Sequence, residues 1–99
     1  MAIESIDIDD EVLTLRSQSK GFGKIAQTLG LGRARDANEA FNRALRRRTP
    51  EEQTAIRCDE NRRLDRLADA VKADESRTKQ DVDKRLRAVE RLRARLMKD

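Results

Sequence analysis

Apolar residues recur along this 99-residue chain at the three- and four-residue spacing of helices that bury one face. The first stripe predicts a helix over about 9–20 and is formed by Ile8, Val12 and Leu15. Acidic residues before it favour a helix start, because they oppose the positive end of the helix dipole. Gly21 is the expected stop. Further upstream, the pattern leaves open whether Ile3 and Ile6 pack as an arm or are disordered.

The middle of the chain predicts a short helix, a glycine turn and a longer helix over about 34–48. The short helix lies between Gly21 and Gly30, and its apolar residues are Ile25, Ala26 and Leu29. The longer helix has an apolar stripe of Ala34, Ala37, Phe41, Ala44 and Leu45. At about 100° per residue, the opposite face carries Arg35, Glu39, Asn42, Arg43 and Arg46. Asn38 falls nearer the edge of the stripe.

The clearest local signal is a helix start at residues 49–52. Thr49 is a natural N-cap, Pro50 suits the first helical position, and Glu52 completes a capping box. We expect the helix that begins there to continue to about Ala73. A final helix is expected over roughly 79–97, because Val82, Leu86, Val89, Leu92 and Leu96 form one stripe.

The polar stretch between these two helices allows two interpretations. In the first it is a turn, and the last two helices pack as an antiparallel hairpin. In the second it continues one long helix, because the 11-residue step from Val71 to Val82 keeps nearly the same face. Either way the predicted fold class is all-α, with three helices over residues 1–48 followed by two amphipathic helices over residues 49–99.

Charge is abundant and unevenly distributed. Charged residues make up 42% of the chain and aromatic residues 2%, so the core must be small and aliphatic. Residues 33–48 carry six basic and two acidic side chains, and residues 77–99 carry nine and four. Positive charge that gathers in two helices is the footprint expected for contact with phosphates.

Several classes of function are disfavoured by what the chain lacks. Cys58 is the single cysteine and there is no histidine, so we expect neither a disulfide nor a Cys/His zinc site. No nucleophile–base set can be assembled, and we expect a protein that is not an enzyme, with no cofactor and no small-molecule substrate. No apolar run reaches the length of a membrane span. The expected location is cytoplasmic and nucleoid-associated.

The segment Ile25-Ala-Gln-Thr-Leu-Gly-Leu31 resembles the middle of a helix-turn-helix motif. The resemblance implies that the short helix braces the longer one, which enters the major groove of DNA as a recognition helix. The downstream half departs from the motif, because Asp36 stands where an apolar residue is expected. The turn is therefore longer than usual or the second helix is rotated. The alternative is a structural helical hairpin with an incidentally basic face.

A second resemblance covers residues 63–71 and 82–96. Their sequences, RLDRLADAV and VDKRLRAVERLRARL, resemble the helical segment after the helix-turn-helix in some phage-type DNA-binding proteins, including terminase small-subunit-like ones. Transposase accessory proteins of insertion sequences have a similar layout, in which a coiled coil follows the helix-turn-helix. Both resemblances imply DNA recognition with self-assembly and no catalysis. They leave transcriptional control and phage or mobile-element DNA handling open.

The proposed partner is double-stranded DNA, and its contacts can be assigned by residue type. Phosphates are expected to meet Lys20, Lys24, Arg33, Arg47 and Arg48. Base edges are expected to meet Arg35, Asn42 and Arg46, because arginine and asparagine make bidentate contacts with guanine and adenine. Arg43 is also expected to contact DNA. Glu39 accepts from cytosine or holds Arg35 and Arg43 in place. The competing functions are a helical protein-interaction module and a nucleoid-type non-specific DNA binder.

We also expect a homodimer held by the two C-terminal helices. Each stripe is narrow, and a single small DNA-binding module buries limited surface, so pairing two chains would strengthen both the fold and DNA binding. Two recognition helices would then reach successive major grooves. The expected dimer interface contains Leu64, Leu67, Val71, Leu86, Val89 and Leu96.

Overall fold

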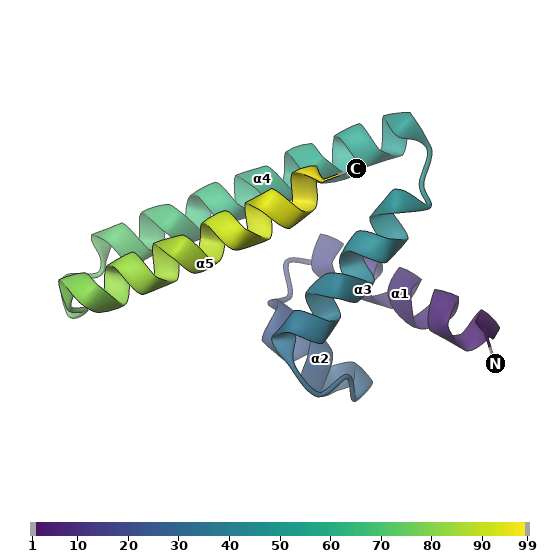
Figure 1. Cartoon of the computed structure of the whole chain (residues 1–99), viewed down its shortest axis with the longest axis horizontal. Coiled ribbons are helices and arrows are strands. Elements are labelled where there is room, and N and C mark those ends of the chain that lie inside the picture. The colour runs from purple at the N-terminus through teal and green to yellow at the C-terminus, as the bar shows by residue number, and fades with distance from the viewer. Residues whose placement is uncertain (1, 99) are drawn as a thin grey trace. The chain divides into compact units, whose positions relative to one another are not determined.

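The computed structural model describes residues 2–98, with side chains from Asp7 to Lys98. The described chain is all-α, as predicted, and its helices are labelled α1 to α5 in Figure 1. Contacts divide the chain into a three-helix unit, Met1–Gln53, and a hairpin unit, Thr54–Asp99. The boundary between them falls inside α4.

The three-helix unit contains α1 (Ala2–Ser17), α2 (Phe22–Leu29) and α3 (Ala34–Arg46). α3 packs against both of the others (Figure 1). The prediction of a first helix over about 9–20 is wrong at both ends. α1 already begins at Ala2, and it stops early because Ser19 takes a left-handed conformation with φ of 65°. The expectation for Ile3 and Ile6 concerns side chains outside the described ones.

The core of this unit is closed by the two aromatic residues of the chain. The rings of Phe22 and Phe41 meet edge to face, with centroids 5.6 Å apart. The Arg16 guanidinium lies over the ring of Phe22, 4.0 Å from its centroid. The remaining core is aliphatic, as the composition predicted, and includes Val12, Ile25, Ala37, Ala44 and Leu45.

The connection between α2 and α3 depends on two left-handed glycines. Gly30 ends α2 with φ of 68°, and Gly32 follows with φ of 87°. The start of α3 explains why Asp36 stands where the motif has an apolar residue. Its carboxylate accepts a hydrogen bond from the backbone N–H of Arg33 at 3.1 Å, so it caps the start of α3 where an apolar side chain could not.

The N-cap predicted for the first helix of the C-terminal half is confirmed, and the second helix also begins at a threonine N-cap. α4 is Pro50–Ala73, and the Thr49 hydroxyl accepts from the Glu52 N–H at 3.1 Å while the Glu52 carboxylate accepts from the Thr49 N–H at 3.2 Å. α5 is Lys79–Met97, and its N-cap is Thr78, whose hydroxyl accepts from the Asp81 N–H at 3.1 Å.

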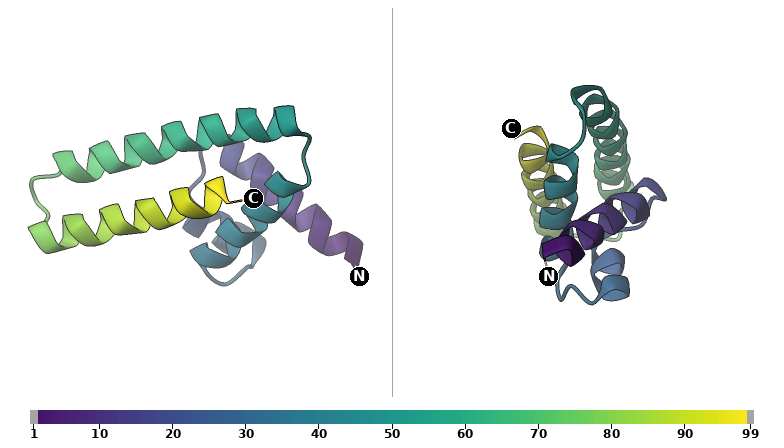
Figure 2. Two further views of the ribbon diagram at one scale, coloured as in Figure 1. Left: turned by 45° about the horizontal axis from the view of Figure 1, so that its top comes forward. Right: turned by 90° about the vertical axis from the view of Figure 1, so that its right-hand side faces the viewer.

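The hairpin interpretation is correct, and the single long helix is not formed. α4 and α5 lie side by side in both views of Figure 2. At the open end of the hairpin, the Arg93 guanidinium donates to Asn61 at 2.7 Å and to Asp65 at 2.9 Å. The Arg57 guanidinium donates to the carbonyl oxygen of Leu96 at 2.9 Å. These polar contacts join the two helices across the chain reversal.

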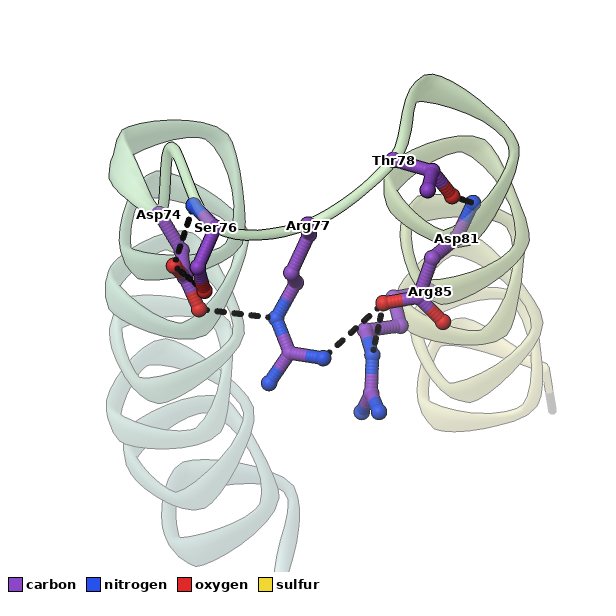
Figure 3. A network of polar contacts seen from close by, with 6 residues as sticks. All are labelled: Asp74, Ser76, Arg77, Thr78, Asp81 and Arg85. Atoms are coloured by element: carbon purple, nitrogen blue, oxygen red, sulfur yellow. Dashed lines mark hydrogen bonds and ion pairs between the residues drawn. The ribbon is translucent and has the colours of Figure 1, made fainter.

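The turn of the hairpin is closed by a polar network (Figure 3). Arg77 lies between the helices and pairs with Asp74 at 3.0 Å and with Asp81 at 2.9 Å. The Ser76 hydroxyl and N–H both donate to the Asp74 carboxylate, which turns the chain away from the axis of α4. No glycine or proline is present in residues 74–78, so this network takes their place as the helix breaker.

Candidate nucleic-acid interface

The exposed side of α3 carries a row of charged side chains. Arg35, Glu39, Arg43 and Arg46 are all exposed, as the helical spacing predicted. They lie opposite Ala37, Phe41 and Ala44, which are buried against α1 and α2. The Arg35 guanidinium lies 3.3 Å from the Glu39 carboxylate, one turn away. Glu39 therefore holds Arg35, one of the two roles expected for it.

The prediction that Asn42 faces outward is wrong. Its side chain is buried, and its Nδ2 donates to the backbone oxygen of Asn38 at 3.0 Å. Asn38 is buried as well, although the spacing placed it only near the edge of the stripe. The buried arc of α3 is wider than its five apolar residues indicated, because neighbouring helices cover more than one side of it. Asn42 is therefore not available as a base contact in this conformation.

The N-terminal end of the short helix offers cations and unused backbone donors. Lys20, Lys24 and Arg33 are exposed, as expected for phosphate contacts. The N-cap of α2 is Gly21, which has no side chain to accept from the first N–H groups of the helix. A shallow cavity of about 240 Å³ lies beside this end and is lined by Leu15, Lys20, Lys24, Ile25 and Thr28. Such an end attracts anions.

The C-terminal end of α3 is different, because α1 neutralises it. The Arg43 guanidinium donates two hydrogen bonds to the Asp9 carboxylate, from Nε at 2.9 Å and from Nη2 at 3.0 Å. Arg47 donates to the same carboxylate at 3.1 Å, and Arg48 donates to Asp10 at 3.2 Å. Three of the arginines predicted to contact DNA are thus ion-paired within the chain. The prediction that Glu39 holds Arg43 is replaced by this pairing with Asp9.

The buried carboxylate of Asp9 is kept ionised by its partners. Burial alone would raise the pKa of Asp9, but the hydrogen bonds and charges of Arg43 and Arg47 outweigh burial and lower the pKa below its usual value. Sequence reasoning missed Asp9 as a partner of α3, since Asp9 and Arg43 are 34 residues apart in the chain. The available signal was the one-turn spacing of Arg43 and Arg47, whose mutual repulsion a carboxylate between them would relieve.

Most of the residues predicted for a dimer interface are already buried within one chain. This is true of Leu64, Val71, Val89 and Leu96. Leu86 is half-buried, and Leu67 has 45% of its surface exposed. Leu67 borders a small apolar groove of about 130 Å³ in the hairpin unit, together with Val71, Arg85, Ala88, Val89 and Leu92. The surface available to a partner is therefore narrower than the sequence predicted.

Other types of site find no support in the described part of the chain. Residues 2–98 contain no group of three or more side chains that could hold a metal ion. No described helix is both long enough and apolar enough to cross a membrane. Comparison with family models finds no match, and comparisons with curated proteins and with solved structures find none either. The functional proposal therefore rests on the geometry of α2 and α3.

Proposed function

We propose that this protein binds double-stranded DNA by placing the exposed side of α3 in the major groove. The observation that carries the proposal is the row of exposed charged side chains on α3, opposite its packed face. A helix braced by a shorter helix through a tight turn, with its free side rich in arginine, fits the dimensions of a major groove.

The N-terminal half of the interface supplies the phosphate contacts in this proposal. Lys20 and Lys24 flank the uncapped start of α2, whose backbone N–H groups are suited to a phosphate oxygen. Arg33 stands at the start of α3 with 69% of its side chain exposed. Base contacts fall to Arg35 and Arg46, which project from the same side of α3.

Dimerisation through the hairpin unit is the second part of the proposal. One recognition helix gives limited affinity, and two would bind successive major grooves about 34–36 Å apart. Leu67 is the exposed member of the expected interface. Solution mass of the unmodified protein and of Leu67→Asp tests this part. A monomer at tens of micromolar that still binds DNA tightly would contradict it.

A protein-interaction module is the second candidate, and the groove beside Leu67 is the observation that favours it. In that case the amphipathic hairpin binds a helix of another protein, and the arginines of α3 serve only as a solvated surface. The two functions differ in one measurable property. A DNA-binding protein has affinity for duplex DNA at low salt, and an interaction module has none.

The experiment that tests DNA binding compares arginines on the proposed interface with a matched arginine elsewhere. A preferred duplex is first selected from random oligonucleotides. Arg35→Ala and Arg46→Ala should each weaken binding to it by about 1–3 kcal/mol, and weaken binding to random DNA much less. Arg87→Ala in α5 removes the same charge from an exposed helix position and should have little effect.

Two other outcomes of this experiment have clear meanings. Equal losses on the selected and the random duplex would assign Arg35 and Arg46 to phosphates and favour the nucleoid-type non-specific binder. Equal losses for Arg87→Ala and Arg35→Ala would show that only net charge matters, and the proposed position of α3 in the groove would then be wrong.

A further inference from the structure

The carboxylates of α1 occupy the arginines at the C-terminal end of α3. We propose that Asp9 and Asp10 compete with DNA phosphates for Arg43, Arg47 and Arg48, so that α1 limits the DNA affinity of the protein. This inference rests on the DNA binding proposed above and describes how that same site is regulated. It assigns a function to two acidic residues that a phosphate-binding surface would not otherwise need.

The position of Asp9 makes it a strong competitor. Its side chain is buried, yet it reaches two guanidiniums, those of Arg43 and Arg47. If either arginine moved away, the buried Asp9 carboxylate would keep fewer hydrogen-bond partners. The loss of a partner raises the free energy of a buried charge more than that of an exposed one, because water reaches it poorly. The arginines therefore stay paired with α1 unless contact with a phosphate offsets the free energy of the lost hydrogen bonds.

The same arginines remain open to an anion on their outer side. The side chain of Arg43 is 51% exposed and that of Arg47 is 39% exposed. In the described part of the chain, no partner accepts from Nη1 of Arg43. A phosphate can thus approach, but it meets three arginine charges reduced by the two negative charges of Asp9 and Asp10. The local charge is +1 in place of +3.

The pair of Arg48 with Asp10 is the weaker of the two restraints. Both side chains are partly exposed, at 33% and 45%, and such pairs contribute little in water. A phosphate can displace Asp10 from Arg48 more readily than Asp9 from Arg43. The two carboxylates therefore offer a graded test, in which Asp10 can be neutralised with little risk to the fold.

The test measures duplex DNA affinity and its salt dependence for Asp9→Asn, Asp10→Asn and the double variant. Each phosphate contact contributes about 0.9 to the slope of log affinity against log salt. Each arginine released should therefore tighten binding on the order of fivefold near 0.15 M salt and steepen the slope by about 0.9. Circular dichroism melting establishes that each variant is folded at the titration temperature.

Two controls separate competition from a general change in charge. Asp7→Asn and Glu11→Gln remove the same charge from exposed positions of α1 and should give a much smaller gain. In a background that carries Arg43→Ala and Arg47→Ala, Asp9→Asn should give no gain, because the arginines it would release are absent. Asp10→Asn should keep its gain in that background, since Arg48 remains.

The outcomes distinguish this inference from the proposed function. Weaker binding by folded Asp9→Asn would overturn it and would mean that Asp9 positions the arginines for DNA. An equal gain from Asp7→Asn, or a gain that persists without Arg43 and Arg47, would also overturn it. Binding by the unmodified protein with no gain in any of the three variants would overturn the inference and leave the proposed function standing. Absence of binding by both the unmodified protein and the double variant would refute the proposed function and the inference with it.

Discussion

Different interactions stabilise the two units of this chain, each within itself. In the three-helix unit, an edge-to-face pair of phenylalanines lies in an aliphatic core, and helix ends are set by left-handed turns. In the hairpin unit, an apolar stripe is buried and polar side chains join the helices at both ends; Figure 3 shows the network at the turn. In the three-helix unit, apolar burial, which salt does not screen, is joined by the ion pairs around the buried Asp9. In the hairpin unit, the ion pairs of Arg77 and Arg93 are partly exposed and should weaken with salt. By contrast, the pair of Arg63 with Glu60 in the same unit is largely buried.

The two units also expose different kinds of surface, one suited to binding a ligand and the other to pairing with another helix. The three-helix unit holds α3 by its buried face and leaves its charged row exposed, as a binding site on a packed element requires. The hairpin unit leaves Leu67 exposed beside a groove, as a surface for another helix requires.

Phe41→Ala should destabilise the three-helix unit by about 3–5 kcal/mol, because it removes one ring of the aromatic pair and leaves a cavity. Hydrogen exchange followed residue by residue measures the effect separately in each unit. Protection should fall in α1, α2 and α3 and persist at the turn end of the hairpin. Phe41→Leu is the matched control and should cost much less. Equal losses of protection for the two variants would contradict the role assigned to the aromatic pair.

Asp9→Asn should destabilise the protein by roughly 1.5–3 kcal/mol near neutral pH, because charge-assisted hydrogen bonds to Arg43 and Arg47 are lost. The pKa of Asp9 is lowered from 3.8, so its contribution is complete above that pH and is lost as pH falls through the lower folded value. Denaturant unfolding from pH 6 down to pH 2 should show the two proteins converging below pH 3.8. A constant difference would contradict the ion-pair explanation.

Thr49→Ala should destabilise the protein by roughly 0.5–2 kcal/mol, because the first turn of α4 loses the hydroxyl that accepts from Glu52 N–H. Thr49→Ser preserves the acceptor and serves as the control. Thermal melting followed by circular dichroism measures both. An unchanged midpoint for Thr49→Ala would show that the capping box contributes nothing measurable.

Arg77→Ala should give the smallest effect, a modest loss of protection at the turn of the hairpin. Its two partners, Asp74 and Asp81, are partly exposed, so their attraction to Arg77 is already screened by water. The loss should disappear in 1 M salt, where the Debye length is only about 3 Å. Hydrogen exchange of residues 74–81 in low and high salt provides the measurement. A loss that is independent of salt would mean that Arg77 acts through packing.

The sequence was most informative where structure depends on neighbours in the chain. Thr49 with Glu52, and the start of α5 at Thr78, followed from spacing alone because a cap and its partner lie three residues apart. The charged side of α3 was predicted for the same reason. Asn42 was misplaced because the width of the buried arc depends on helices from elsewhere in the chain.

Contacts between distant segments were not predictable in this way. The bonds from Arg43 and Arg47 to Asp9 require the register of α1 against α3, which no local pattern specifies. The choice between a hairpin and one long helix had the same difficulty. The structure shows the hairpin, in which Arg77 pairs with residues on both sides of the turn. A segment of helix-forming residues is compatible with both a hairpin and one long helix.

The most direct test of the central proposal is a titration of duplex DNA binding by the unmodified protein at several salt concentrations. If α3 and the start of α2 contact phosphates through Lys20, Lys24 and Arg33, log affinity should fall linearly with log salt. The slope should be near −2.7 for each bound protomer, or about −0.9 for each of the three contacts, and twice that for a dimer that places both recognition helices on the DNA. Lys24→Ala should make the slope shallower by about one unit. A protein that shows no duplex affinity even at low salt would contradict the proposal that it binds DNA.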